Sequence, residues 1–316
     1  MLLKVYLICY NIFFEGNMIH NERFVVSSDK LKRDYKICSL ADIHNNSWAS
    51  FDLWDDLIAE VDKESPDYIF ISGDFVYNSD DFFVPNNDKM FRYLLRNLSE
   101  IAQTFMCLGN HELKSGRKFN NDDAIQYLRM LDRTMDIHVL DKRIGKEFID
   151  TDDIRIGGFC PRNETYYKSC ENMWNNYFIE DYLNSLIEFT KDKFNILLTH
   201  SPDTISQKEV LIALRDKIKE LDLILCGHKH DGYIPKTIQK VGIVHDDFGF
   251  DVSDGKVFFD YIISKTTNCR GEFDVLNAKM IVNRGYRKFS HKSPVFAMLD
   301  KVSSRDMATI TLKKKL

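Results

Sequence analysis

Residues 66–74 read Pro-Asp-Tyr-Ile-Phe-Ile-Ser-Gly-Asp. Within them, residues 67–72 form a short run that is mostly aromatic and β-branched, as expected for a strand buried on both faces of a sheet. Gly73 and Asp74 end the run, so the backbone can turn sharply where a carboxylate is presented. The stretch therefore predicts a buried strand that carries a polar side chain at its carboxyl end.

The same arrangement occurs five times, because each such run is followed closely by Asp, Asn or His. The runs are Tyr35–Leu40, Asp67–Ser72, Thr104–Leu108, Phe194–Thr199 and Leu221–Cys226. Stretches with helical character separate them, namely Ser50–Glu64, Asp88–Ile101, Asp122–Arg133, Tyr177–Thr190 and Ser206–Lys219. Strands that alternate with helices predict an α/β layered protein.

The pattern changes after His230, where glycines become frequent and the strand-like runs are short. These runs are Val257–Ile263, Lys279–Val282 and Thr309–Leu312. We expect residues 231–316 to form a second sheet with a long loop, packed on the first. Residues 21–316 then make one domain, preceded by a lead of less certain structure over residues 1–20.

The composition is that of an ordinary globular chain. Its 316 residues include 43 Lys plus Arg and 48 Asp plus Glu, which gives a net charge of −5. A composition with nearly balanced charges is not that of a disordered chain. Its slight negative charge does not favour a non-specific nucleic-acid binder. The 7 cysteines contain no C-x-x-C pair, so they favour a reducing, cytoplasmic compartment over a disulfide framework or a structural zinc site.

The N-terminal stretch Leu2–Phe14 is apolar but shorter than the roughly 20 residues that span a bilayer. Its Val, Tyr, Ile and Phe content favours a strand or an unstructured lead. The alternative is a short or interfacial membrane anchor, which would make the protein membrane-associated through its N-terminus.

The polar residues at the strand ends form a mixed set of oxygen and nitrogen donors, and open α/β sheets place ligand sites at these ends. They are Asp42, His44, Asp74, Asn110, His111, His200, His228 and His230. Such donors suit Mn²⁺, Fe or Zn²⁺ better than Ca²⁺ or Mg²⁺. Seven ligands beside His111 are too many for one tetrahedral ion but suit two ions that share a carboxylate.

Each of these residues also has a simpler interpretation. Asp42 and Asp74 could cap helices, and Asn110 could supply a turn. His228 and His230 share one face of a continuing strand, which equally suits a polar surface. Asp203, after Ser201-Pro202, could cap a helix or orient a ligand histidine.

The five blocks together resemble the motif set of the calcineurin-like metallophosphoesterases. They read Asp42-Ile43-His44, Gly73-Asp74, Gly109-Asn110-His111-Glu112, His200 and Gly227-His228-Lys229-His230, in that order over residues 35–230. Among the branches of this family, the sequence motifs most resemble those of the bacterial membrane-associated phosphoesterases. The resemblance implies two packed mixed β-sheets flanked by helices, a four-layer sandwich with a dinuclear centre at the strand ends.

The resemblance also implies a role for each motif residue. Asp42, His44 and His230 would bind the first metal, Asn110, His200 and His228 the second, and Asp74 would bridge them. The substrate phosphorus would be attacked in line by a hydroxide that bridges the ions. His111 would contact phosphate oxygens and protonate the leaving group, as the catalytic residue. Glu112 would orient a neighbour.

The implied activity is hydrolysis of a small-molecule or lipid phosphoester, either a monoester or a diester, with two divalent ions such as Mn²⁺, Fe²⁺ or Zn²⁺. The stretch after Asp74 lacks the Arg of calcineurin-type protein phosphatases, which argues against that branch. Tyr77 stands where purple acid phosphatases have a ligand, but with His44 available we interpret it as packing. The alternative function is a catalytically silent metal-binding or scaffold protein, and no motif indicates an oligomeric state.

Overall fold

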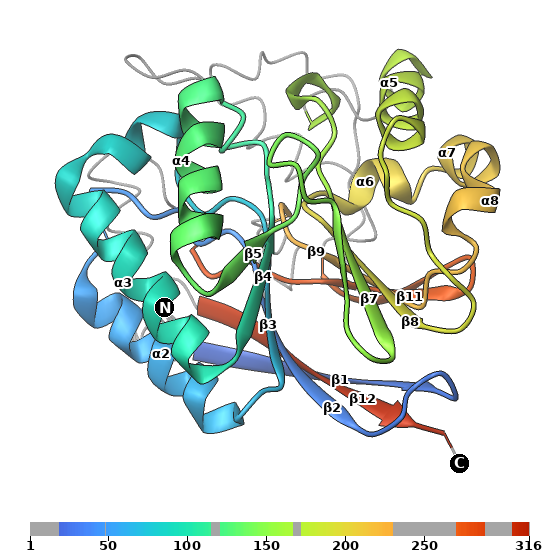
Figure 1. The fold of residues 1–316 in the computed structure, drawn as a ribbon, viewed down its shortest axis with the longest axis horizontal. Helices are drawn as coiled ribbons and strands as arrows, with labels where there is room; N and C mark the ends of the chain where they lie inside the picture. The colour runs from blue at the N-terminus through green and yellow to red at the C-terminus, as the bar shows by residue number, and fades with distance from the viewer. Residues whose placement is uncertain are drawn as a thin grey trace, which may run out of the picture.

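The computed structural model describes residues 19–47, 49–114, 121–166, 172–229, 270–287 and 305–315. Two sheets of six strands each pack against each other through their inner faces, and helices cover their outer faces (Figure 1). The predicted α/β class with two packed mixed sheets is confirmed. His230, the N-terminal stretch Leu2–Phe14 and the run Val257–Ile263 lie outside the described residues.

The first sheet contains the three motif strands nearest the N-terminus. Its order is β1 (Ile19–Ser28), β12 (Arg305–Lys314), β2 (Tyr35–Leu40), β3 (Tyr68–Ser72), β4 (Gln103–Cys107) and β5 (Ile137–Val139). Strands β2 to β5 are parallel, and β12 is antiparallel to β2. The carboxyl ends of β2, β3 and β4 therefore meet at one edge.

The second sheet contains the two remaining motif strands. Its order is β10 (Gly271–Val275), β11 (Ala278–Val282), β9 (Leu223–Cys226), β8 (Phe194–Thr199), β7 (Ile154–Phe159) and β6 (Phe148–Asp150). The four central strands β11, β9, β8 and β7 are parallel. Strands β8 and β9 accordingly end at a common edge.

One topological expectation was wrong, namely that residues 231–316 would form a second sheet packed on the first. Strands β10 and β11 extend the sheet of β8 and β9, whereas β12 lies between β1 and β2 of the first sheet. Residues 306–310 of β12 are buried without a break. Such a strand is stable only between two others, where both faces are covered and both backbone edges are paired.

Helices cover the outer face of each sheet. Helices α2 (Phe51–Glu64), α3 (Pro85–Ile101) and α4 (Asn121–Thr134) lie on the first sheet, while α5 (Asn172–Leu183), α6 (Pro202–Ile205), α7 (Lys208–Ala213) and α8 (Arg215–Ile218) lie beside the second (Figure 1). The helix expected over Ser206–Lys219 is thus two short helices, and α5 ends before Thr190. No helix among the described residues is long and apolar enough to cross a bilayer.

Helix α2 illustrates why the helices form where they do. The Ser50 side chain accepts a hydrogen bond from the Leu53 N–H and caps the helix. Leu53, Leu57 and Val61 then recur at helical spacing and are buried against the sheet. Burial of this apolar face, at about 1.5–3 kcal/mol per large side chain, holds α2 in place.

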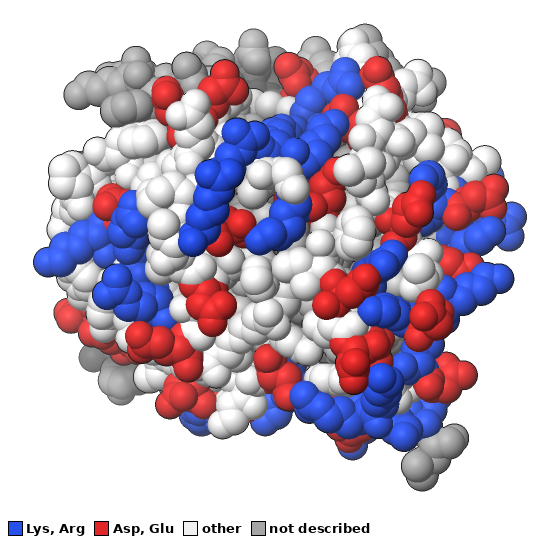
Figure 2. All heavy atoms as spheres, in the orientation of Figure 1, with Lys and Arg blue, Asp and Glu red and all other residues white. Residues whose placement is uncertain are grey.

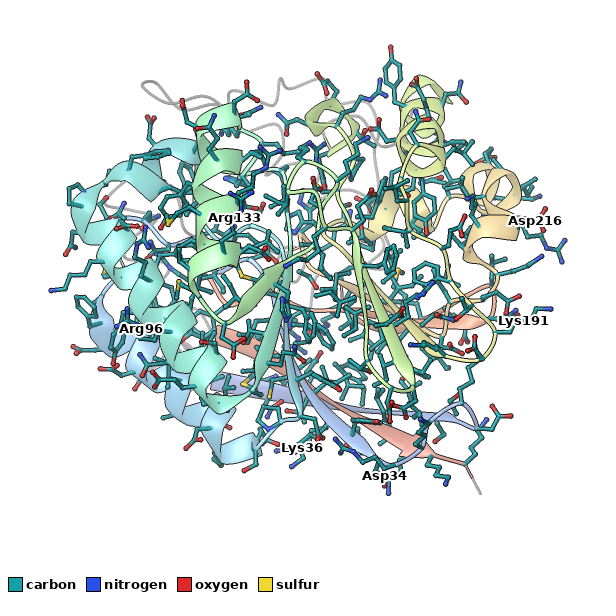
Figure 3. The ribbon with its side chains drawn as sticks, viewed as in Figure 1. Asp34, Lys36, Arg96, Arg133, Lys191 and Asp216 are labelled. Carbon is teal, nitrogen blue, oxygen red and sulfur yellow. The ribbon has the colours of Figure 1, made fainter. Side chains whose placement is uncertain are left out.

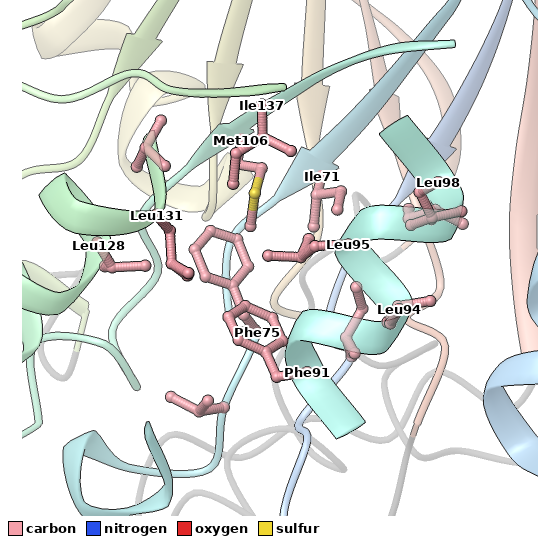
Figure 4. Close-up of a cluster of buried hydrophobic side chains, with 14 of the residues drawn as sticks. Ile71, Phe75, Phe91, Leu94, Leu95, Leu98, Met106, Leu128, Leu131 and Ile137 are labelled. Atoms are coloured by element: carbon pink, nitrogen blue, oxygen red, sulfur yellow. The ribbon is translucent and has the colours of Figure 1, made fainter. Parts of the chain in front are cut away.

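Apolar side chains fill three layers, one between the sheets and one under each set of helices. Figure 4 shows the layer under α3 and α4, where Phe75 and Phe91 stack at 6.1 Å between ring centroids. Figure 3 shows side chains filling the interior, while Arg96 and Asp216 point outward. This packing makes the strand ends a rigid base for the loops that follow them.

Candidate metal centre

The loops after β2, β3, β4, β8 and β9 bring together all the described motif residues. The residues are Asp42, His44, Asp74, Asn110, His111, His200 and His228. Asp42, Asp74 and His200 are almost completely buried, although each is polar or charged. Because an uncompensated buried charge is costly, such a cluster needs opposite charges or a bound ion.

Asp74 stands at the centre of the cluster. One of its carboxylate oxygens lies 3.0 Å from Nε2 of His200, 3.7 Å from Nε2 of His44 and 3.9 Å from Nε2 of His111. Two sets of ligand atoms are compact enough to hold a metal ion, with all atoms within 4.8 Å of one another, and Asp74 belongs to both. The sets are His44, Asp74 and His111, and Asp74, His200 and His228.

Asp42 joins the two sheets across the same centre. Its Oδ1 lies 3.9 Å from Nε2 of His44 and 3.9 Å from Nε2 of His200. Its carboxylate also accepts the backbone N–H of His228, at 2.9 and 3.2 Å. The loop after β2 is thereby tied to the loops after β8 and β9.

The backbone at the centre is held in a rarely populated conformation. Asp42, His44, Asp74 and His228 have φ of 54°, 46°, 55° and 72°. Only two other described non-glycine residues, Ser65 and Leu276, have positive φ. A non-glycine residue in the left-handed region costs on the order of 1 kcal/mol or more, so the surrounding structure must enforce it.

Two glycines allow the strand ends to approach each other. A Cβ atom on Gly109 would lie 2.2 Å from Oδ1 of Asp74, and one on Gly227 would lie 2.4 Å from Cβ of Ala41. Real Cβ atoms do not come so close, so only glycine fits at these positions. The glycines of the motifs thus set the spacing of the side chains beside them.

Glu112 organises two of the loops through their backbone. Its carboxylate accepts N–H groups from Gly109 at 2.7 Å, Asp74 at 3.0 Å, Phe75 at 2.8 Å and Val76 at 3.2 Å. Burial raises its pKa to about 8, and the charge of Asp74 adds to this effect, whereas the N–H donors oppose it. Glu112 therefore orients its neighbours through their backbone N–H groups, in agreement with the orienting role that the motif resemblance implied.

The two central histidines are oriented by backbone carbonyl groups. Nδ1 of His200 lies 2.7 Å from the carbonyl oxygen of Ser72, and Nδ1 of His111 bonds to the carbonyl of Tyr77. Each ring then presents Nε2 to Asp74, the arrangement that metal-ligating histidines usually have. Burial lowers the pKa of His200, but the carboxylates of Asp74 and Asp42 outweigh it and raise the value to about 9.

The donors fit a divalent cation in one further respect. Oδ1 of Asn110 is buried, and among the described residues it has no hydrogen-bond donor. A buried carbonyl oxygen without a donor is costly, and a cation is the partner that would satisfy it. The cluster therefore combines carboxylate, amide and imidazole donors that Mn²⁺, Fe²⁺ or Zn²⁺ would accept.

Sequence reasoning missed the contribution of residues 283–287. The Asn283 side chain donates to the carbonyl of Ser39 at 2.7 Å, and Nη1 of the buried Arg287 donates to the carbonyl of His44 at 2.7 Å. Gly285, with a φ of 83°, lets this segment pass the side chain of Asp42. A glycine closely following a strand-like run was the available signal, as at Gly73.

The segment after β8 also differs from expectation. Asp203 lies in the first turn of α6, and its carboxylate contacts Nζ of Lys229, which is buried.

Two tyrosine rings lie against the histidines of the centre. The ring of Tyr166, which no motif indicated, lies 5.8 Å from the ring of His200 and 5.5 Å from that of His228, between centroids. Tyr77 packs its ring against His111, at 5.2 Å between centroids.

The sequence profile of the calcineurin-like phosphoesterases matches residues 35–232, more than half of the chain and the whole run of motif strands. The chain belongs to the calcineurin-like phosphoesterase family. This confirms the resemblance seen in the five motif blocks. The metal-binding role of each single residue stays a prediction.

The curated relatives of this family member include metallophosphoesterases of several bacteria. An uncharacterised metallophosphoesterase of Campylobacter jejuni is 28% identical over 66% of this chain and 47% of its own length. Phosphodiesterase YaeI of Escherichia coli K12 is 28% identical over 63% of this chain and 62% of its own. The chain thus spans about half the length of the first of these relatives.

Among solved structures, a dimetal phosphatase from Danio rerio aligns with 87% of this chain and 91% of its own. It shares 12% sequence identity at a TM-score of 0.42. The family assignment consequently rests on the sequence profile, and the two-sheet architecture on the structure described above.

Proposed function

We propose that this family member is a phosphoesterase that hydrolyses a phosphomonoester or phosphodiester with two divalent metal ions. The observation that carries the proposal is the position of Asp74, whose carboxylate belongs to both sets of ligand atoms. A carboxylate shared by two ligand sets is what a pair of adjacent ions requires.

The proposed ligands come from both sheets. Asp42, His44 and His230 would hold one ion, and Asn110, His200 and His228 the other, with Asp74 shared. Two bound ions would supply an activated water and would stabilise negative charge on the phosphoryl oxygens. Placing the donors on buried strand ends fixes their spacing before any ion binds.

The ligand set of His44 and Asp74 also includes His111, but we assign His111 to the substrate, as the motif resemblance implies. Its Nδ1 is engaged by the Tyr77 carbonyl, and its Nε2 faces Asp74 at 3.9 Å. A ring held in this way can donate from Nε2 to a phosphoryl oxygen or protonate the leaving oxygen. Burial lowers its pKa, although the charge of Asp74 partly opposes this.

The substrate is an ester of a small molecule or a lipid. One relative is a named phosphodiesterase, which supports a diester within the proposed range. Residues 21–316 remain proposed as a single domain, and association of the N-terminal stretch with a membrane remains the alternative to a wholly cytoplasmic location.

The proposal is tested on protein stripped of metal and reloaded with Mn²⁺. We expect hydrolysis of an aryl phosphodiester or aryl phosphomonoester and close to two ions per chain by metal analysis. Asp74→Asn should lose metal, whereas His111→Ala should keep it but turn over about 10²- to 10⁴-fold more slowly. Metal binding without turnover of any ester would favour the silent scaffold, and full activity of both variants would refute the residue assignment.

A further inference from the structure

A cavity of about 650 Å³ opens between α4, the loop after β5 and the 3₁₀ turn η2 (Asn163–Tyr166). Its lining includes three arginines, which come from different elements. Arg129 lies on α4, Arg143 follows β5, and Arg162 precedes η2. Three guanidinium groups around one polar cavity are the arrangement that recognises phosphate or carboxylate oxygens.

The cavity borders the proposed metal centre along two segments of chain. Leu113 lines it and directly follows Glu112, whose carboxylate holds the backbone N–H of Asp74. On the other side, η2 contributes Glu164 to the lining and Tyr166 to the rings of the metal centre. The cavity and the centre are thus built on the same two segments of chain, and their residues are one or two positions apart in each.

Two of the guanidinium groups form ion pairs with carboxylates. Nη1 of Arg143 lies 3.1 and 3.0 Å from the oxygens of Asp141, and its Nη2 donates to a backbone carbonyl at 3.2 Å. Arg162 donates to Asp181 through Nε at 3.0 Å and Nη2 at 2.7 Å, and its Nη2 also donates to Glu180 at 2.9 Å, which leaves Nη1 for a ligand. Such contacts pre-orient an arginine while leaving other N–H groups of its fork for a ligand.

Arg129 differs from both, since among the described residues no carboxylate forms an ion pair with it. Its side chain is exposed and contacts the carbonyl oxygen of Arg143. Asp122 and Glu164 also line the cavity, and since both are exposed like Arg129, water screens all three charges. Figure 2 shows Lys and Arg atoms gathered over α4 and the adjoining loops on this face.

We propose that this arginine cavity binds a second anionic group of the substrate, a phosphate or a carboxylate separate from the phosphoester that is hydrolysed. The inference rests on the proposed function, because it takes the neighbouring cluster to be the site of hydrolysis. It narrows the substrate to a phosphoester that carries a further acidic group.

The test measures binding of three probe series to the metal-loaded full chain by calorimetry. The probes are alkyl monophosphates, alkanediol bisphosphates and ω-carboxyalkyl phosphates, each with two to eight carbons. At one chain length or more, we expect the bisphosphate or the carboxyalkyl phosphate to bind at least about tenfold more tightly than the alkyl monophosphate. The series with the larger gain identifies the second group.

Arg129→Gln should reduce that gain about fivefold and leave the alkyl monophosphate affinity unchanged, because it removes the exposed guanidinium. Arg133→Gln is the matched control, since Arg133 lies one turn further along α4, is exposed and is not part of the lining. Arg129→Glu should abolish the gain.

The inference is overturned if no probe with a second acid binds more tightly, or if Arg129→Gln weakens all three series equally. Hydrolysis of an aryl phosphate by the same preparation is measured separately. Binding gains that depend on Arg129 without any hydrolysis would contradict the proposed function and leave the anion-binding cavity standing.

Discussion

At the scale of single residues, the geometry of the centre depends on the backbone conformation of the loops that carry its side chains. Four proposed ligands have positive φ, and Glu112 accepts four backbone N–H groups of the loops that carry Asp74 and Asn110. The sequence indicated a polar residue at each strand end. It could not indicate the left-handed conformation, because no local signal makes Asp or His prefer it over the usual regions.

This dependence predicts the effect of Glu112→Gln. A glutamine has one carbonyl oxygen, so part of the N–H donors would face its amide N–H instead of an acceptor. We expect the free energy of unfolding of the metal-free protein to fall by about 2–3 kcal/mol, with weaker metal binding.

Glu147→Gln is the control, because Glu147 is also buried but accepts the N–H of Leu186, at 3.0 Å, away from the centre. Denaturant unfolding and metal titration measure both variants. Equal losses for the two would show that the four N–H contacts of Glu112 carry no special weight.

At the scale of elements, the short helix α6 is fastened to the end of β9 by one ion pair. Asp203 and Lys229 have side-chain exposures of 13% and 5%, so water screens their attraction little. Lys229 lies between His228 and His230 in the chain, and the pair therefore helps to fix the loop that carries two proposed ligands. The sequence allowed Asp203 to cap a helix or to orient a ligand histidine, whereas the structure places it inside the first turn of α6, in contact with Lys229, 26 residues away.

We expect Asp203→Asn to lower the free energy of unfolding by about 2 kcal/mol or more, because the buried ammonium group would face a neutral amide. Lys229→Met combined with Asp203→Asn should cost less than the sum of the single changes. A double-mutant cycle by denaturant unfolding measures this coupling.

The control is the Lys146–Asp132 pair outside the centre, because its lysine side chain is 33% exposed and its ammonium group is therefore better solvated than that of Lys229. Asp132→Asn should cost about 1 kcal/mol or less. Additive losses for Asp203 and Lys229 would contradict their coupling.

At the scale of the whole molecule, the proposed ligands come from two sheets whose inner faces share one apolar layer. Asp42, Asp74 and Asn110 follow strands of the first sheet, while His200 and His228 follow strands of the second. Ions bound between them would link the sheets directly. The metal-free centre holds protons in their place, since burial raises the pKa of Asp42 to about 7 and neighbouring carboxylates raise that of His200 to about 9.

Removal of metal should therefore lower the melting temperature. A ligand present at a hundred times its dissociation constant raises the free energy of unfolding by about 2.7 kcal/mol. For a domain of this size, that raises the melting temperature by about 5 °C. Differential scanning calorimetry with Mn²⁺ and with chelator measures the shift, and Asp74→Asn should show none. An unchanged wild-type melting temperature would argue against a metal centre.

Metal binding should also release protons, because both raised pKa values belong to groups that must lose a proton to bind. The apparent affinity is then expected to rise with pH between 6 and 8, by about tenfold per unit for each proton displaced. Calorimetry in two buffers with different ionisation enthalpies counts the protons. An affinity independent of pH over this range would contradict the proposed ligands.

The sequence by itself determined the elements and the order of the motifs. Buried runs that end in Gly, Asp, Asn or His are local signals, since each strand records its own burial and its own turn. From them follow the α/β class, the family and the set of residues now found together at the strand ends.

Only the tertiary structure decided how these parts meet. It placed β12 in the first sheet, set residues 283–287 against the loop of His44, and formed the arginine cavity from three separate elements. These contacts join residues far apart in the chain, and no periodicity or motif encodes which distant surfaces will pack. Their physical basis is the shared burial of two sheets, which fixes the loops only after the layers have closed.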